Sequence, residues 1–167
     1  MFRRICLTVA LAVLASGTGC GDEQEDARVP FDVLTGTLGP EGGELVGEDG
    51  TSLSGVSLSV PAGVLSEAVA VEVRLVVDET PLPDNAFSIG DQFQVGGDAA
   101  LAGSATLTVP FDPEEMRRFI EDIQGVKVWR RAGEGWETAD VVAVDEQRVS
   151  VAVDALSTYG PGVRVAD

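Results

Sequence analysis

Short stretches in which apolar and polar residues alternate with a period of two run through most of this chain, and they restrict it to strand-rich folds. Residues 56–60 alternate in this way, and within residues 69–77 Glu72 and Arg74 fall on one face while valines fall on the other. Such alternation is typical of a strand with one buried face. The same pattern indicates further strands at residues 87–95, 105–109, 126–130, 141–144 and 148–153.

Glycine, proline, aspartate and asparagine fill the gaps between these stretches, for example at residues 49–50, 81–85 and 133–135. About eight short strands separated by such turns predict an all-β domain, an Ig-like antiparallel β-sandwich over residues 35–164. Three glycines are interpreted as residues that allow tight turns or close backbone approach, namely Gly42, Gly43 and Gly63.

One segment has the period of a helix instead. Asp112 is suited to cap a helix that has Pro113 at its first position and Glu115 at its third. Apolar residues then recur at helical spacing, at Met116, Phe119, Ile120 and Ile123. We predict one short amphipathic helix near residues 113–124 that covers an edge or end of the sandwich, with docking onto a partner or membrane as the alternative.

The first 20 residues have the pattern of an export signal. Arg3 and Arg4 precede an apolar run at residues 5–15, and small residues at 16–19 lead to Cys20. A spanning helix needs about 18 apolar residues, so a cleaved signal peptide at residues 1–19 is favoured over a retained anchor.

The end of this segment resembles the lipobox of bacterial lipoproteins, with small Gly19 directly before Cys20, although Gly17 stands where leucine is commonest. The resemblance implies cleavage before Cys20 and acylation of its thiol, which would fix the chain to a membrane. Cys6 would leave with the signal, so the mature chain has no second cysteine for a disulfide. An ordinary secreted signal and an uncleaved anchor remain as alternatives.

Residues 20–34 are charged and poor in apolar residues, which predicts a flexible tether behind the acylated cysteine. Asp directly after the cysteine is a retention signal in some bacterial lipoproteins, but here Gly21 follows and Asp22 comes second. We therefore expect a lipid-anchored protein of the bacterial cell envelope, with the outer membrane favoured and either the periplasmic or the surface side open.

Charge and composition exclude several classes of function. The chain has 28 acidic and 11 basic residues and a net charge of −17, and loss of Arg3 and Arg4 leaves 28 against 9, or −19. So acidic a protein is a poor partner for nucleic acid. The chain has no histidine, which excludes Ser-His-Asp and Cys-His catalysis and the usual zinc sites. No glycine-rich loop joins a strand to a helix, so nucleotide binding has no support.

Five motifs in order resemble the ZU5 domain, a β-sandwich module. They are the Gly42-Gly43 turn, the Pro61-Ala62-Gly63-Val64-Leu65 corner, the strand exit Leu107-Thr108-Val109-Pro110-Phe111-Asp112, the hairpin of Val126-Lys127-Val128-Trp129 with Trp136, and the last strand and corner over residues 149–159. The resemblance covers about residues 35–162.

Some members of that family cleave themselves at a "H-F-S" corner, where a serine hydroxyl attacks the preceding carbonyl. The matching residues here are Ala155, Leu156 and Ser157, with alanine in place of the assisting histidine. A serine without a base is a weak nucleophile. We expect no self-cleavage and no catalytic residue.

The sequence favours a non-enzymatic envelope lipoprotein that binds the membrane through lipid on Cys20 and holds an unidentified protein or envelope polymer, with no cofactor and no metal. A calcium-dependent adhesion or carbohydrate-binding module is the alternative, with an acid-pair enzyme third. Trp129 and Trp136 are predicted to pack in or beside the core, with sugar stacking as the weaker interpretation. Candidate calcium loops contain Glu48-Asp49-Gly50, Asp78-Glu79, and Asp112 with Glu114 and Glu115.

Overall fold

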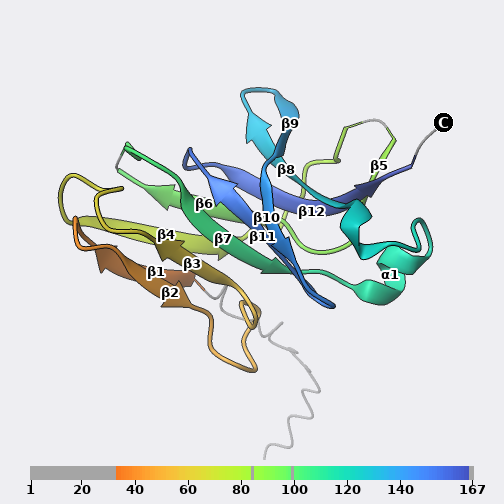
Figure 1. The fold of residues 1–167 in the computed structure, drawn as a ribbon, viewed down its shortest axis with the longest axis horizontal. Coiled ribbons are helices and arrows are strands. Elements are labelled where there is room, and N and C mark those ends of the chain that lie inside the picture. Colours follow the sequence, from red (N-terminus) through yellow and green to blue (C-terminus); the bar gives the residue numbers. More distant parts are fainter. Residues whose placement is uncertain (1–32, 84, 99, 166–167) are drawn as a thin grey trace, which may run out of the picture.

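The computed structural model describes residues 33–83, 85–98 and 100–165, which form two antiparallel sheets packed face to face (Figure 1). The larger sheet contains β1 (Val33–Leu38), β4 (Val69–Leu75), β5 (Ala86–Ser88), β6 (Phe93–Gly97), β8 (Val126–Ala132), β9 (Gly135–Ala139) and β12 (Thr158–Arg164). Its order is β1-β4-β6-β12-β8-β9, with β5 also beside β12. The smaller sheet contains β2 (Gly43–Val46), β3 (Ser57–Val60), β7 (Ala105–Pro110), β10 (Val141–Val144) and β11 (Arg148–Val153), in the order β10-β11-β7-β3-β2. The predicted all-β sandwich is confirmed.

Alternate residues of the two sheets meet to form the core. In β7, Ala105, Leu107 and Val109 are buried, whereas Thr108 lies on the outer face, where its hydroxyl is 2.9 Å from that of Ser150. The valines of β11 follow the same rule. Burial of a Val or Leu side chain contributes about 1.5–3 kcal/mol, so the period-two pattern itself selects the face that each strand buries.

The chain crosses from one sheet to the other at both lateral edges of the sandwich. Between β1 and β2 it does so in a tight turn, in which the Gly42 N–H donates to the Gly39 carbonyl at 2.9 Å. Between β9 and β10 the crossing takes the single residue Asp140, whose carbonyl accepts from the Ala152 N–H at 2.9 Å. At each lateral edge, the edge strand of the larger sheet is therefore connected directly in the chain to the edge strand of the smaller sheet.

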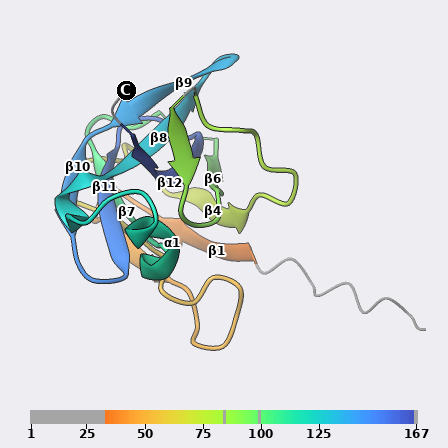
Figure 2. The same cartoon turned by 90° about the vertical axis from the view of Figure 1, so that its right-hand side faces the viewer.

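The helix is shorter than predicted and lies at one end of the strands (Figures 1 and 2). It spans Pro113–Arg117 (α1), and a separate 3-10 turn follows at Ile123–Gly125. The N-cap prediction is confirmed, because the Asp112 carboxylate accepts from two backbone N–H groups. The predicted short helix is present, but it ends at Arg117 rather than near residue 124, and Asp122 caps a separate turn before the last of the apolar residues that pack on the sandwich.

Residues 87–95 are not one strand as predicted but two, β5 and β6, separated by a buried connection. Ile89 is 1% exposed and Gln92 is 2% exposed within it. The segment from Val76 to Asp91, here called the strap, runs out from β4 and returns through β5; Figure 2 shows its outer loop in yellow-green. The Gln92 side chain pairs with both backbone groups of Thr80, at 3.2 and 2.6 Å. The buried side chain of Gln92 thus bonds to the strap within the stretch where the alternation of apolar residues predicted one continuous strand.

The last strand, β12, was not predicted because glycine and proline are read as turn residues. It nevertheless lies inside the larger sheet. Pro161 has no N–H, but it lies between the stretch of β12 that pairs with β6 and the stretch that pairs with β5, where the ladder needs no N–H. Its carbonyl accepts from the Ile89 N–H at 3.3 Å. A Cβ at Gly162 would lie 2.6 Å from the Phe87 carbonyl oxygen, so close approach requires glycine.

β1 also escaped prediction, and it begins two residues before the predicted domain boundary at residue 35. Its inward positions are Leu34, Gly36 and Leu38, so the central one has no apolar side chain to complete the alternation. A Cβ at Gly36 would lie 2.4 Å from Leu45 Cδ2. Leu45 of β2 therefore fills the space that the pattern in β1 leaves empty.

Alanine substitutions at two glycines distinguish the cost of an unfavourable φ angle from the cost of a steric clash. Gly42 and Gly50 have similar positive φ angles of 78° and 83°. A Cβ at Gly42 meets the Val60 carbonyl oxygen at 2.4 Å, whereas nothing lies within 4 Å at Gly50. We expect Gly50→Ala to cost about 1 kcal/mol of unfolding free energy, from the φ angle alone, and Gly42→Ala about 3 kcal/mol or more. Denaturant unfolding measures both; equal losses would show that the contact at Gly42 is relieved without cost.

Candidate functional site

The predicted acidic candidates lie apart from one another. Glu48-Asp49-Gly50 lies in the loop between β2 and β3, Asp78-Glu79 in the strap, and Asp112, Glu114 and Glu115 at α1. Among the residues that the structure describes, no three acidic or cysteine side chains gather closely enough to hold a metal ion. Cys20 and the leader lie outside the described residues.

Several of these carboxylates have structural contacts. Asp112 accepts from the N–H groups of Glu114 and Glu115 at 2.8 and 3.2 Å, and Glu115 pairs with Arg118 at 2.5 Å. Glu79 accepts from the Gln92 N–H at 2.9 Å. Helix capping and loop closure account for these groups, because capping carboxylates satisfy N–H groups that would otherwise have no partner.

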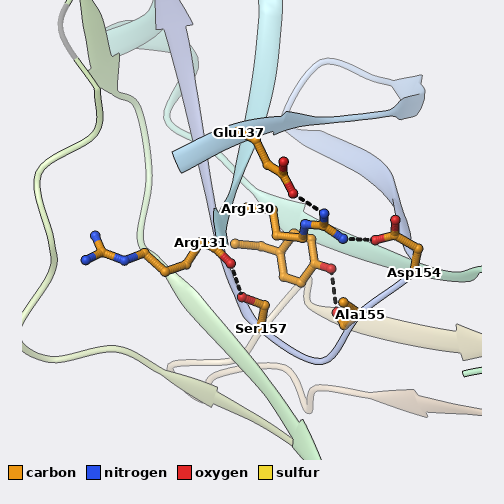
Figure 3. Close-up of polar contacts among 7 residues, drawn as sticks. Arg130, Arg131, Glu137, Asp154, Ala155 and Ser157 are labelled. Carbon is orange, nitrogen blue, oxygen red and sulfur yellow. Dashed lines mark hydrogen bonds and ion pairs between the residues drawn. The ribbon is translucent and has the colours of Figure 1, made fainter. Parts of the chain in front are cut away.

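The densest polar cluster forms around Arg130 at the end of β8, where β9 and the corner between β11 and β12 meet (Figure 3). The Arg130 guanidinium pairs with Glu137 of β9 and with Asp154 of the corner. Its side chain is 21% exposed, against 47% and 65% for the two carboxylates. The hydrogen bond with Glu137 is the main cause that raises the pKa of Arg130. The cluster ties the β8–β9 hairpin to the corner that follows β11, 24 residues from Arg130 along the chain.

Beneath this cluster lies Tyr159, which is fully buried and is the only tyrosine of the chain. Its hydroxyl donates to the Ala155 carbonyl at 2.7 Å (Figure 3). This bond, back to a residue four positions upstream, is the arrangement known as a tyrosine corner in immunoglobulin-like sandwiches. Burial raises the pKa of Tyr159 to about 12, with Arg130 opposing the shift.

Ser157 lies in the same corner, but it is not set up as a nucleophile. Its hydroxyl donates to the Arg131 carbonyl at 2.6 Å (Figure 3). A carbonyl oxygen cannot take the hydroxyl proton, so this contact fixes the corner rather than activating the oxygen. The absence of self-cleavage remains a prediction of the sequence, and the Ser157 contact agrees with it.

A hollow of about 200 Å³ opens beside Arg130 between the two sheets. Its charged lining consists of Arg130, Glu137, Asp140 and Asp154. The guanidinium of Arg130 is already paired with two of these carboxylates, so its positive charge is neutralised by groups of the protein itself. The arrangement acts as a clamp across the edge of the sandwich, a role that sequence reasoning missed because the three partners share no motif.

The two tryptophans lie on the outer face of the larger sheet. Trp129 is 1% exposed, packs near Gly162 and the strap residue Leu82, and has no hydrogen-bond partner for its indole N–H among the described residues. Trp136 donates to the Pro81 carbonyl at 2.9 Å, and the Arg131 guanidinium lies 5.5 Å from its ring centre. Trp129 is therefore buried as predicted, but under the strap rather than between the sheets, and Trp136 holds the strap in place.

The chain matches no known family model, and no curated protein matches it. Its relation to ZU5 domains and to lipoproteins stays a prediction from the motifs. Within the described part of the chain, no helix has the length and apolar content needed to cross a membrane.

The raised pKa of Tyr159 predicts a loss of stability at high pH. The unfolded phenol ionises near pH 10, whereas the folded one stays neutral to about pH 12, so the stabilisation is complete below pH 10 and disappears as pH rises from 10 to 12. We expect the unfolding free energy to fall by about 2–3 kcal/mol across this window. Phenolate absorbance reports Tyr159 alone in the folded chain, and an apparent pKa near 10 would contradict the prediction.

The Arg130 clamp is tested by removing its charge while keeping its aliphatic stem. Arg130→Met is expected to lower the unfolding free energy by about 1 kcal/mol, because two carboxylates lose a half-buried partner. Arg74→Met is the matched control: Arg74 also pairs with a carboxylate, that of Glu72, but is 47% exposed, so its loss should be a few tenths of a kcal/mol. Equal losses in denaturant unfolding would argue against a clamp.

Proposed function

We propose that this chain is a non-enzymatic lipoprotein of the bacterial cell envelope. It is anchored in a membrane through acyl chains on Cys20 and presents a ZU5-like β-sandwich to a protein or envelope polymer. The outer membrane is the proposed site, with the sandwich on its periplasmic or its surface side. The role is structural: the sandwich holds or spaces a partner near the membrane.

The observation that carries the proposal is the order of segments in the chain. A signal-like leader ends at Cys20, and the first strand of a folded domain begins at Val33, 13 residues later. A flexible chain of about 13 residues reaches roughly 20 Å, which keeps the sandwich near the membrane while letting it turn. The acidic composition of that segment disfavours its burial in the domain.

The placement of the ZU5-like motifs supports the domain assignment. The Gly42-Gly43 turn begins β2, and Phe111-Asp112 leads out of β7 into α1. Residues 126–129 and Trp136 belong to the β8–β9 hairpin, and Ser157 lies in the corner before β12. These four of the five motifs thus fall at the kind of strand or turn that the resemblance implies.

Intact mass tests the anchor. The protein isolated from its own membranes should have the mass of a chain that begins at Cys20 plus acyl groups, because the thiol is the acylated group. Cys20→Ala should lose the acyl mass, whereas Cys6→Ala, in the part of the leader that is removed, should keep it.

A chain that begins near Cys20 without lipid would contradict the proposal. The protein would then be a secreted domain with a free thiol and without a lipid anchor. An acylated Cys20→Ala variant would equally exclude Cys20 as the attachment point.

A further inference from the structure

The strand β2 forms a regular, open edge of the smaller sheet. It pairs with β3 without interruption from Gly43 opposite Val60 to Val46 opposite Ser57, and no strand of the described structure pairs with its other side, although β1 of the opposite sheet lies next to it (Figure 1). An open edge strand presents backbone donors and acceptors to which another extended chain can bind.

The groups that face away from β3 can be identified from the ladder. The Gly47 N–H donates to the Val56 carbonyl at 2.8 Å, so Gly47 points its backbone groups toward β3. Because this direction alternates along an antiparallel strand, Leu45 also faces β3, whereas Glu44 and Val46 point theirs outward. Two residues therefore offer an N–H and a carbonyl each to an incoming strand.

This edge is uniformly acidic. Residues 39–56, which comprise the turn before β2, the strand and the loop after it, contain no lysine or arginine. They contain four exposed carboxylates, those of Glu41, Glu44, Glu48 and Asp49. Two copies of β2 placed edge to edge would bring like charges together, which is destabilising, so the edge disfavours a second copy and favours a basic strand.

A hollow of mixed polarity lies beside the same edge. It has a volume of about 280 Å³ and opens between β1 and β2, where Val33, Leu34, Val46 and Leu53 share its lining with the polar residues Thr35, Glu48 and Thr51. Leu53 is 2% exposed, whereas Val33 and Val46 are 43% and 57% exposed. Side chains of an added strand alternate between the two faces of the sheet, so every second one would lie beside Glu44 and Val46 on the outer face, while the others would point toward β1, whose residues line the hollow.

Three other edges, those of β10, β9 and β1, are less suited to this role. The ladder of β10 with β11 is broken by a register shift between Val141 and Ala143, which disrupts pairing. The chain turns directly from β9 into β10, so β9 adjoins this irregular edge. The exposed side chains of β1 are uncharged, namely Val33, Thr35 and Thr37, and give no basis for selecting a partner by charge.

We infer that β2 is a docking edge for an extended segment of a partner protein that carries lysine or arginine at every second position and apolar residues between them. The segment adds an antiparallel or parallel strand to the five-stranded sheet, its basic residues meet the carboxylates around Glu44, and an apolar residue enters the hollow. This inference rests on the proposed binding function and names the mode of binding and the chemistry of the partner.

The test uses the full mature chain as isolated from membranes, in detergent, with two synthetic peptides that alternate valine with lysine or valine with glutamate. The lysine peptide should bind with an affinity that falls as the salt concentration rises. Once bound, it should slow hydrogen exchange at the Glu44 and Val46 amides. Glu44→Lys should weaken the lysine peptide by about tenfold and reduce the difference in affinity between the lysine and glutamate peptides, because the edge then carries three carboxylates and one ammonium group. Val46→Pro, which removes an outward N–H without removing a hydrogen bond to β3, should abolish edge protection.

Glu67→Lys is the matched control. It makes the same change of charge at an exposed position in the loop between β3 and β4, and it should leave both affinities unchanged. The inference is overturned if the lysine peptide fails to bind, if Glu67→Lys weakens it as much as Glu44→Lys, or if the Glu44 and Val46 amides are not protected at saturation. Should Val46→Pro unfold, the charge exchange at Glu44 decides alone.

The mass of the same sample reports the anchor separately. An acylated chain that does not bind the peptide would overturn only the docking edge. A chain without lipid that binds at β2 would leave the docking edge in place while contradicting the proposed anchor.

Discussion

The mutual burial of the two inner sheet faces is the interaction on which the rest of the structure depends. The valines of β7 and β11 and Leu107 are almost completely buried between the sheets, and most outer residues of the same strands are polar. This apolar contact brings the β8–β9 hairpin and the corner before β12 close enough for Arg130, already opposite Glu137, to pair with Asp154 as well. Polar contacts of this kind contribute little by themselves, so they fix an arrangement that burial has already formed.

Much of the fold could be predicted from local sequence because alternation and burial coincide in the strands of the core. Residues 141–144 and 148–153 form strands with the predicted bounds. β12 could not be predicted, because its Gly160-Pro161-Gly162 run is explained only by what lies above and beside it: Leu82, Trp129 and the break between β5 and β6. The requirement for glycine there comes from tertiary contact, which a single sequence does not reveal.

Most of the candidate site could not be predicted from the sequence either, because its residues are also brought together by tertiary contacts. Ser157 and the tryptophans were found through motifs, whereas Arg130 and Glu137 meet through the register of the β8–β9 hairpin and Asp154 reaches them only because the two sheets pack together. Gln92 is the clearest omission. Its buried amide pairs with Thr80 in both directions, as a backbone group would, and this contact is formed only because the strap folds back over the sheet.

The direct crossing from β1 to β2 has a mechanical consequence. A force between the N-terminal end of β1 and a load held on β2 would pass through only 14 residues, Val33 to Val46, and through the turn at Gly39 to Gly42 that joins them. Tension would reach the remaining strands only through the ladders that β1 forms with β4 and β2 with β3. Within the core, only Leu38 and Leu45 belong to the loaded segment, so the domain can transmit a pull along one margin while most of its core lies outside the path of the force.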